Sequence, residues 1–80
     1  SSIISNRLIY HYPEKIIFVG RRKHQKYIFS VRSSKKVILG PLTKALQGLD
    51  GGGGGHELAC GLNIKQKDFE IFLERFKNLL

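Results

Sequence analysis

Five consecutive glycines, at positions 51 to 55, constrain this chain more than any other feature. Glycine has no Cβ, so its backbone can adopt positive φ and can approach a ligand closely. The run leads directly into His56 and then into residues 57–60, which are compatible with a short helix. A glycine-rich loop that ends at the start of a helix is a candidate cradle for an anion. The candidate functional site is therefore expected at residues 50–61.

A flexible linker is the alternative interpretation of the glycine run. Both flanks look structured, which argues against it. Residues 62–64 alternate as in a strand, and neither flank is long enough to be a complete domain. Upstream, four apolar residues follow the i, i+3, i+4, i+7 spacing of one helical face: Leu42, Ala45, Leu46 and Leu49.

Length and composition limit the class of protein. Eighty residues make one small domain, and a hydrophobic fraction of 41% indicates a real core. The chain has no apolar run of membrane-spanning length and no N-terminal signal pattern, so we expect a soluble, cytoplasmic protein. The single cysteine, Cys60, excludes an internal disulfide. Because the chain lacks methionine and begins at Ser1, we expect a fragment of a longer protein.

The net charge of +8 is concentrated in the first half of the chain. Residues 1–47 carry ten Lys and Arg against one acid, Glu14, whereas residues 48–80 carry four basic and five acidic residues. A polyanionic partner such as nucleic acid explains this asymmetry, because Lys and Arg contacts to phosphate supply most sequence-independent affinity. A merely solubilising surface is the alternative for scattered lysines.

The hydrophobic patterns predict a small α/β or α+β fold, in which a mixed β-sheet is flanked by helices and a glycine-rich loop leads into a short helix. The continuous apolar run at 16–19 is expected to be a strand buried on both faces. Alternation along the next strand puts Ser30 and Arg32 side by side on one face, and an arginine there needs a partner. We expect helices over residues 2–11, 41–48, 57–60 and 68–80, and strands over residues 16–19, 27–32 and 62–65.

This order of elements resembles the DHH-associated C-terminal domain of the DHH phosphoesterase superfamily. The resemblance is carried by SVRS at 30–33, GGGGGHELACG at 51–61 and the amphipathic terminal helix, and it covers residues 2–80. The superfamily includes RecJ-like single-strand exonucleases, nano-RNases and cyclic dinucleotide phosphodiesterases. The resemblance implies a substrate-binding domain, spanning residues 1–80, that holds a nucleotide against a separate catalytic DHH domain. That absent domain would carry the Mn²⁺ or Mg²⁺ ions.

The resemblance also implies roles for individual residues. His56 would donate a hydrogen bond to the phosphate near the cleaved bond, and Arg32 would pair with a phosphate or terminal nucleotide. Ser30 and Ser33 would help to position Arg32. The amides that would face the phosphate belong to Gly53, Gly54 and Gly55.

The chain lacks the residues for metal-dependent hydrolysis by itself. The Asp-His-His motif is absent, and Asp50 and Asp68 are the only aspartates. Metal-activated water needs several carboxylate or imidazole ligands. His56 and Cys60 share i, i+4 spacing but supply two ligands at most. We therefore expect no metal site and no activity in this chain alone.

Other glycine-loop functions fit the residues less well. A P-loop needs Lys and then Ser or Thr after the last glycine, and a dinucleotide fingerprint needs a strand just before the glycines. The C-terminal domain of alanyl-tRNA synthetase has a similar glycine-rich segment, which would make this a tRNA-binding module. A non-catalytic interaction domain of a replication complex is a third reading. Because His56 directly follows the glycines, we favour the substrate-binding domain of a RecJ-like exonuclease acting on single-stranded DNA or RNA.

Overall fold

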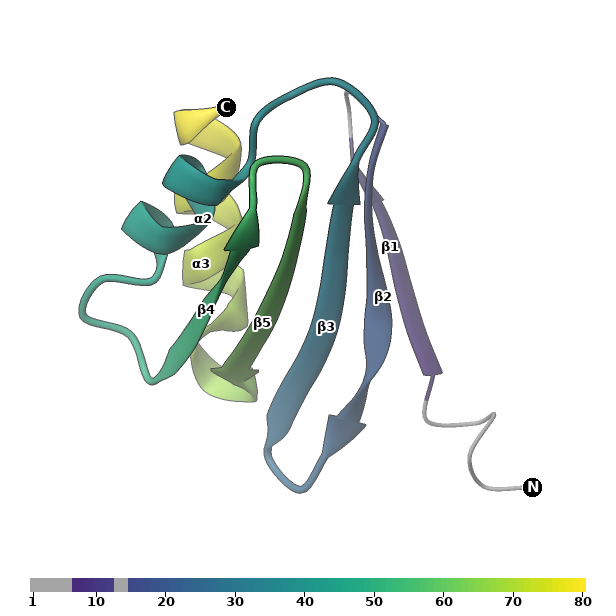
Figure 1. Cartoon of the computed structure of the whole chain (residues 1–80). Coiled ribbons are helices and arrows are strands. Elements are labelled where there is room, and N and C mark those ends of the chain that lie inside the picture. Colours follow the sequence, from purple (N-terminus) through teal and green to yellow (C-terminus); the bar gives the residue numbers. More distant parts are fainter. Residues whose placement is uncertain (1–6, 13–14) are drawn as a thin grey trace.

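The computed structural model describes residues 7–12 and 15–80, which form a five-stranded sheet with two helices. The strand order is β1-β2-β3-β5-β4, and each neighbouring pair is antiparallel (Figure 1). This confirms a small α+β fold, but the predicted mixed sheet is wrong. The elements are β1 (Arg7–Tyr12), β2 (Ile16–Lys23), β3 (Lys26–Ser33), α2 (Leu39–Ala45), β4 (Gly51–His56), β5 (Ala59–Lys65) and α3 (Gln66–Leu79).

The five glycines form β4, an edge strand, and not the predicted loop. The strand pairs with β5 from Gly51 opposite Ile64 to His56 opposite Ala59, across a turn at Glu57 and Leu58. The predicted short helix at 57–60 is therefore also wrong. The segment forms a strand because its buried residues, Cys60, Leu62 and Ile64, follow the two-residue period of a strand. Burying all three against the helices requires the extended strand β5.

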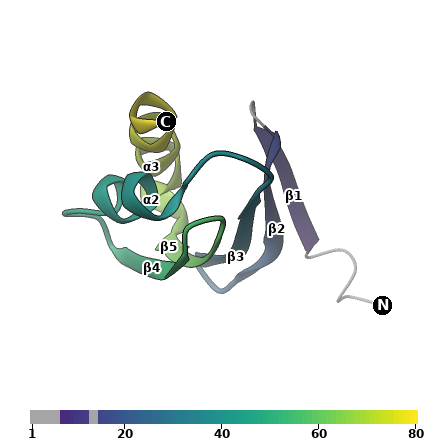
Figure 2. The ribbon, with the colours of Figure 1, turned by 45° about the horizontal axis from the view of Figure 1, so that its top comes forward.

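Both helices cover the same face of the sheet (Figure 2). We call this the covered face and the opposite side the open face. The prediction for the terminal helix is confirmed, since its apolar stripe is buried against the sheet. The α3 ring of Phe69 stacks on Phe29 of β3 with centroids 5.3 Å apart, and Phe18 of β2 meets Phe72 and Phe76 edge-on. These rings form the centre of the core.

The N-terminal prediction is wrong where the structure describes it. Residues 7–12 are strand β1 and not the end of a helix, while residues 2–6 lie outside the described part. The half-buried side chains of β1 are Leu8, Tyr10 and Tyr12, at every second position. From this extended strand beside β2, Tyr10 packs on Phe29 and Phe69.

Strand β2 is buried on one face only, so the prediction of two buried faces is wrong. Ile16 and Phe18 are fully buried, whereas Ile17 is 37% exposed on the open face. The alternation predicted for β3 is confirmed, with Phe29 and Val31 buried and Arg32 exposed.

The second helix is confirmed, but it begins at Leu39 and not at the predicted Pro41. It ends at Ala45, and Gly48 then turns the chain with φ of 79°. Arg75 of α3 donates hydrogen bonds to the carbonyls of Ala45 at 3.3 Å and Gln47 at 2.8 Å, which ties the end of α2 to α3. Within the described residues, no helix is long and apolar enough to cross a membrane.

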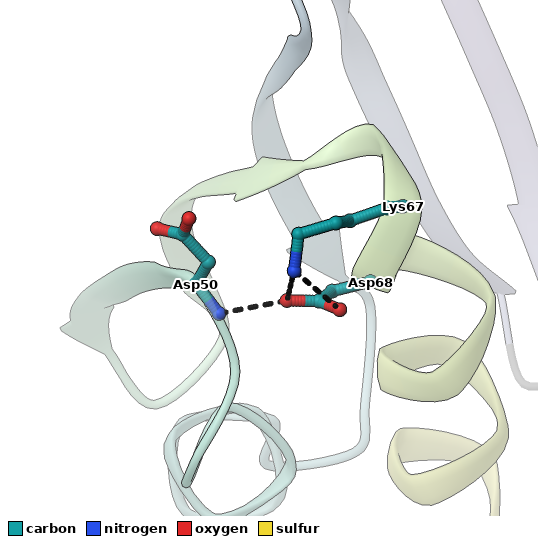
Figure 3. Close-up of polar contacts among 3 residues, drawn as sticks. All are labelled: Asp50, Lys67 and Asp68. Carbon is teal, nitrogen blue, oxygen red and sulfur yellow. Dashed lines mark hydrogen bonds and ion pairs between the residues drawn. The ribbon is translucent and has the colours of Figure 1, made fainter.

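The start of β4 is tied to the start of α3 by Asp68 (Figure 3). The Asp50 backbone N–H donates to Asp68 Oδ2 at 2.9 Å, and Lys67 Nζ lies 3.4 Å from the same oxygen. The Asp50 amide is the main cause that lowers the pKa of Asp68, and Lys67 adds to it. Since this carboxylate also lies in the first turn of α3, it complements the helix dipole.

Candidate functional site

The open face carries the alternate side chains of all five strands. Their positions follow from the strand registers and from the burial of the intervening residues on the covered face. In strand order across the sheet they are Arg7, Ile9 and His11 (β1), Ile17, Val19, Arg21 and Lys23 (β2), Lys26, Ile28, Ser30 and Arg32 (β3), Ala59, Gly61, Asn63 and Lys65 (β5), and Gly52, Gly54 and His56 (β4).

Arg32 and His56 lie on this face in one row across the sheet. His56 pairs with Ala59, and Ala59 pairs with Arg32. The two side chains therefore start two strands apart, about 10 Å at the usual strand spacing of about 4.8 Å. Both residues are exposed, and the alanine between them leaves the intervening space open. A phosphate-sized anion can reach both a guanidinium and an imidazole here.

The backbone around His56 is held by hydrogen bonds from the last residue of β3 and from the segment that follows it. Ser33 N–H donates to Leu58 O at 2.9 Å, and Ile38 N–H donates to Glu57 O at 2.8 Å. The Cys60 thiol donates to His56 O at 3.3 Å. The turn after His56 is thus fixed to the strand that carries Arg32, which keeps the two functional groups in register.

Beside this row, the open face is bare backbone. Gly54 pairs with Gly61, and a Cβ on either residue would meet nothing within 4 Å. A Cβ on Gly52 would have only Asn63 Nδ2 nearby, at 3.8 Å. Packing therefore does not explain glycine at these positions. Because these glycines have no side chains, they leave a flat surface that a ligand backbone can approach closely.

The other glycines of β4 are explained by sterics. A Cβ on Gly53 would lie 2.6 Å from Gly61 O and 3.0 Å from Leu42 Cδ2 of α2. Gly55 has φ of 149°, and a Cβ there would lie 2.5 Å from Ala59 O. These residues, with Gly51, let the edge strand lie close to β5 and α2.

The amides of β4 divide in the same alternating way. Lys65 N–H donates to Asp50 O at 2.9 Å, which marks this pair as hydrogen-bonded. Because bonded and non-bonded pairs alternate along an antiparallel ladder, Gly54 bonds to β5 while Gly53 and Gly55 direct their amides toward the outer edge of the sheet. The N–H of Gly55, adjacent to His56, and that of Gly53, two residues earlier, thus face outward, where an anion can accept from them.

A hollow of about 180 Å³ lies next to Arg32 on the open face. Its lining is Ile17, Val19, Ser30 and Arg32. Aliphatic walls with one hydroxyl and one guanidinium suit a flat, partly polar group such as a nucleobase or a sugar.

Along its strands the open face carries charge of one sign, and Asp50, just before β4, lies opposite Lys65 at one end of it. Within residues 7–12 and 15–80, its strands hold no Asp or Glu. Glu70 and Glu74 are exposed on α3, in the opposite layer. The cationic and imidazole residues of the open face are Arg7, His11, Arg21, Lys23, Lys26, Arg32, His56 and Lys65. Such a surface attracts polyanions at long range.

The structure brings together only part of the residue set expected from the sequence. Ser30, Arg32, Gly54 and His56 share the open face, whereas Gly53 and Gly55 are turned to the covered face. Ser33 also belongs to the covered face, and its Oγ is buried with no hydrogen-bond partner among the described residues.

Sequence reasoning missed Gly61, Asn63 and the lysines of the open face. The alternation of Cys60, Leu62 and Ile64 is the signal that would have placed Gly61 and Asn63 on the opposite face from the core.

Cys60 and His56 do not share a site. The Cys60 side chain is buried on the covered face, where burial raises the pKa of its thiol, and His56 projects from the open face. In the part of the chain that the structure describes, no group of three or more His, Cys, Asp or Glu residues is arranged to hold a metal ion.

Comparison with known protein families assigns the sequence to one of them. The model of the DHHA1 domain family matches residues 1–80, so the chain belongs to that family. It is thereby an accessory domain of the DHH phosphoesterase superfamily, whose members typically join it to a catalytic domain in a larger protein. No curated protein matches the chain.

Proposed function

We propose that this domain binds the phosphodiester backbone of a single-stranded nucleic acid on its open face, as the substrate-binding domain of a RecJ-like exonuclease. The observation that carries the proposal is the row in which His56 and Arg32 flank Ala59, beside the bare backbone of Gly54 and Gly61. Donors from two side chains, on strands that carry no carboxylate in the described part of the chain, match the chemistry of a phosphodiester.

In this proposal each residue has a stated task. Arg32 binds a phosphate through its planar fork of donors, which suits two phosphate oxygens at once. His56 donates one hydrogen bond to the phosphate nearest the cleaved bond. The outward amides of Gly53 and Gly55 offer further donors at the same end of the sheet. The hollow beside Arg32 receives the adjoining base or sugar.

The catalytic step belongs to a separate DHH domain of the parent protein in this proposal. That domain would hold the Mn²⁺ or Mg²⁺ ions that activate water, and the present chain would hold and orient the strand. Residues 1–80 would accordingly bind substrate without cleaving it.

The test is binding of a fluorescent single-stranded octanucleotide to the 80-residue chain. Arg32→Ala removes a charge-assisted contact worth about 1.5–3 kcal/mol, so affinity should fall about tenfold or more. The matched control is Arg22→Ala, an exposed arginine on the covered side of the same hairpin. Equal affinities for wild type, Arg32→Ala and Arg22→Ala would contradict the proposal.

A further inference from the structure

Three lysines form a second cationic row at the other end of the open face. Lys23 pairs with Lys26 across the β2–β3 hairpin, and Lys26 pairs with Lys65 of β5. Because paired residues of antiparallel strands project to the same face, the three lysine side chains start from neighbouring positions on that face. We call these three residues the lysine row.

This arrangement is unfavourable for the fold alone. Like charges directly opposite each other on a sheet destabilise it. Among the described residues, the one ion pair joins Lys67 to Asp68 and does not involve the lysine row. Asp50 lies opposite Lys65 at the end of the row, but its carboxylate forms no ion pair with these lysines. One acid leaves the repulsion of three lysines largely uncompensated.

The lysine row is built on a firm framework. The hairpin turns through His24 with φ of 59°, and the carbonyl of Gln25 accepts a hydrogen bond from Gln66 N–H at 2.8 Å. Lys65 joins β5 to α3, and its own N–H donates to Asp50 O. The ammonium groups therefore project from fixed backbone positions and not from a loose loop tip.

The distance to the Arg32 and His56 row sets the size of a shared ligand. Lys26 lies six residues from Arg32 along β3, which corresponds to about 20 Å at about 3.3 Å per residue. Stacked nucleotides advance about 3.4 Å each along one strand, so about six stacked nucleotides, or fewer extended ones, cover this distance. The surface between the rows offers small, apolar or neutral polar groups: Ser30, Ile28, Gly61 and Asn63.

We propose that the lysine row is a second phosphate-binding site, for the distal phosphates of the strand whose end lies at Arg32 and His56. The inference rests on the proposed function and specifies its substrate class. The ligand is an oligonucleotide that runs along β3 and β5, and a linear or cyclic dinucleotide is too short to occupy both rows.

The experiment compares a dinucleotide with an octanucleotide as ligands of the 80-residue chain, over a range of salt concentrations. The double variant Lys23→Gln with Lys26→Gln should weaken octanucleotide binding about tenfold and leave dinucleotide affinity unchanged. The slope of log K against log salt should fall by about 1.4, which is about 0.7 for each of two lost phosphate contacts. The control is Lys44→Gln with Lys77→Gln, two exposed lysines of the helix layer.

The outcomes separate this inference from the proposed function. If the lysine-row variant binds the octanucleotide as tightly as the helix-layer control does, the inference is overturned. If Arg32→Ala weakens both ligands in the same experiment, the proposed function still stands. Since the lysine-row variant relieves repulsion, its thermal unfolding temperature should not fall, and a loss of affinity cannot then be assigned to unfolding.

Discussion

The two faces of the sheet differ in how far packing explains their residues. On the covered face nearly every residue has a packing reason: Phe18 is fully buried among rings, and Gly53 is the residue that fits between Gly61 and Leu42. On the open face Gly54 has room for a side chain, and Arg32 is exposed without a hydrogen bond to any described residue. Residues without a packing reason, gathered on one face, are the stronger indication of a binding surface.

The largest effect should separate two neighbouring residues of β2. Phe18→Ala removes a fully buried ring and should lower the free energy of unfolding by about 3–5 kcal/mol. Ile17→Ala, on the 37% exposed open side, should cost far less. Urea unfolding of both variants measures the difference, and similar losses for the two would break the comparison between the faces.

The glycines of β4 allow a sharper comparison. Gly53→Ala brings a Cβ against a backbone oxygen and a leucine of α2, so it should lose about 1–3 kcal/mol. Gly54→Ala meets open space and should be neutral or more stable by about 0.5 kcal/mol.

Gly54→Ala should weaken oligonucleotide binding although it does not destabilise the fold, because the new methyl group stands where the ligand backbone approaches. Unfolding curves and affinities measured on the same samples check this pair. Unchanged affinity in Gly54→Ala would remove the bare backbone from the proposed site.

A kinetic comparison distinguishes the two ends of the row. In the protein that carries the catalytic DHH domain, Arg32→Ala should mainly raise KM, because it binds substrate before the reaction. His56→Ala should mainly lower kcat, because its hydrogen bond lies nearest the cleaved bond. Wild-type kinetics in both variants would exclude these residues from the active complex.

The smallest effect concerns acid stability on the covered side. The Asp50 amide lowers the pKa of Asp68 below its ordinary value of 3.8, so the folded state favours the charged carboxylate. This stabilisation is present above that ordinary value and is lost as pH falls through the lowered pKa. Unfolding curves between pH 2 and 7 should therefore show a shallower acid loss for Asp68→Asn than for wild type. Parallel curves for the two proteins would contradict this role.

Elements with strong periodicity could be predicted from the sequence. In α3, Phe69, Phe72 and Phe76 repeat at helical spacing, and in β3 the alternation that puts Arg32 outside is unambiguous. Strand β1 was missed because Leu8 and Tyr12 fit both a helical and an extended period, and the choice depended on pairing with β2.

The glycine strand was missed for a different reason. Glycines have no side chains to reveal a period, so the register came from β5. For the candidate site, the shared face of Ser30 and Arg32 followed from alternation along one strand. The place of His56 in one row with Arg32, and that of Lys65 in the lysine row, depend on the pairing of β3 with β5, which are distant in sequence.

The most direct test of the open face as the binding surface is amide chemical-shift mapping of the 80-residue chain during titration with a single-stranded octanucleotide. The shift changes should concentrate at Arg32, Gly54, His56 and Gly61, and they should be weak along α3. Changes concentrated on α2 and α3, with the open-face amides unmoved at saturation, would contradict the account.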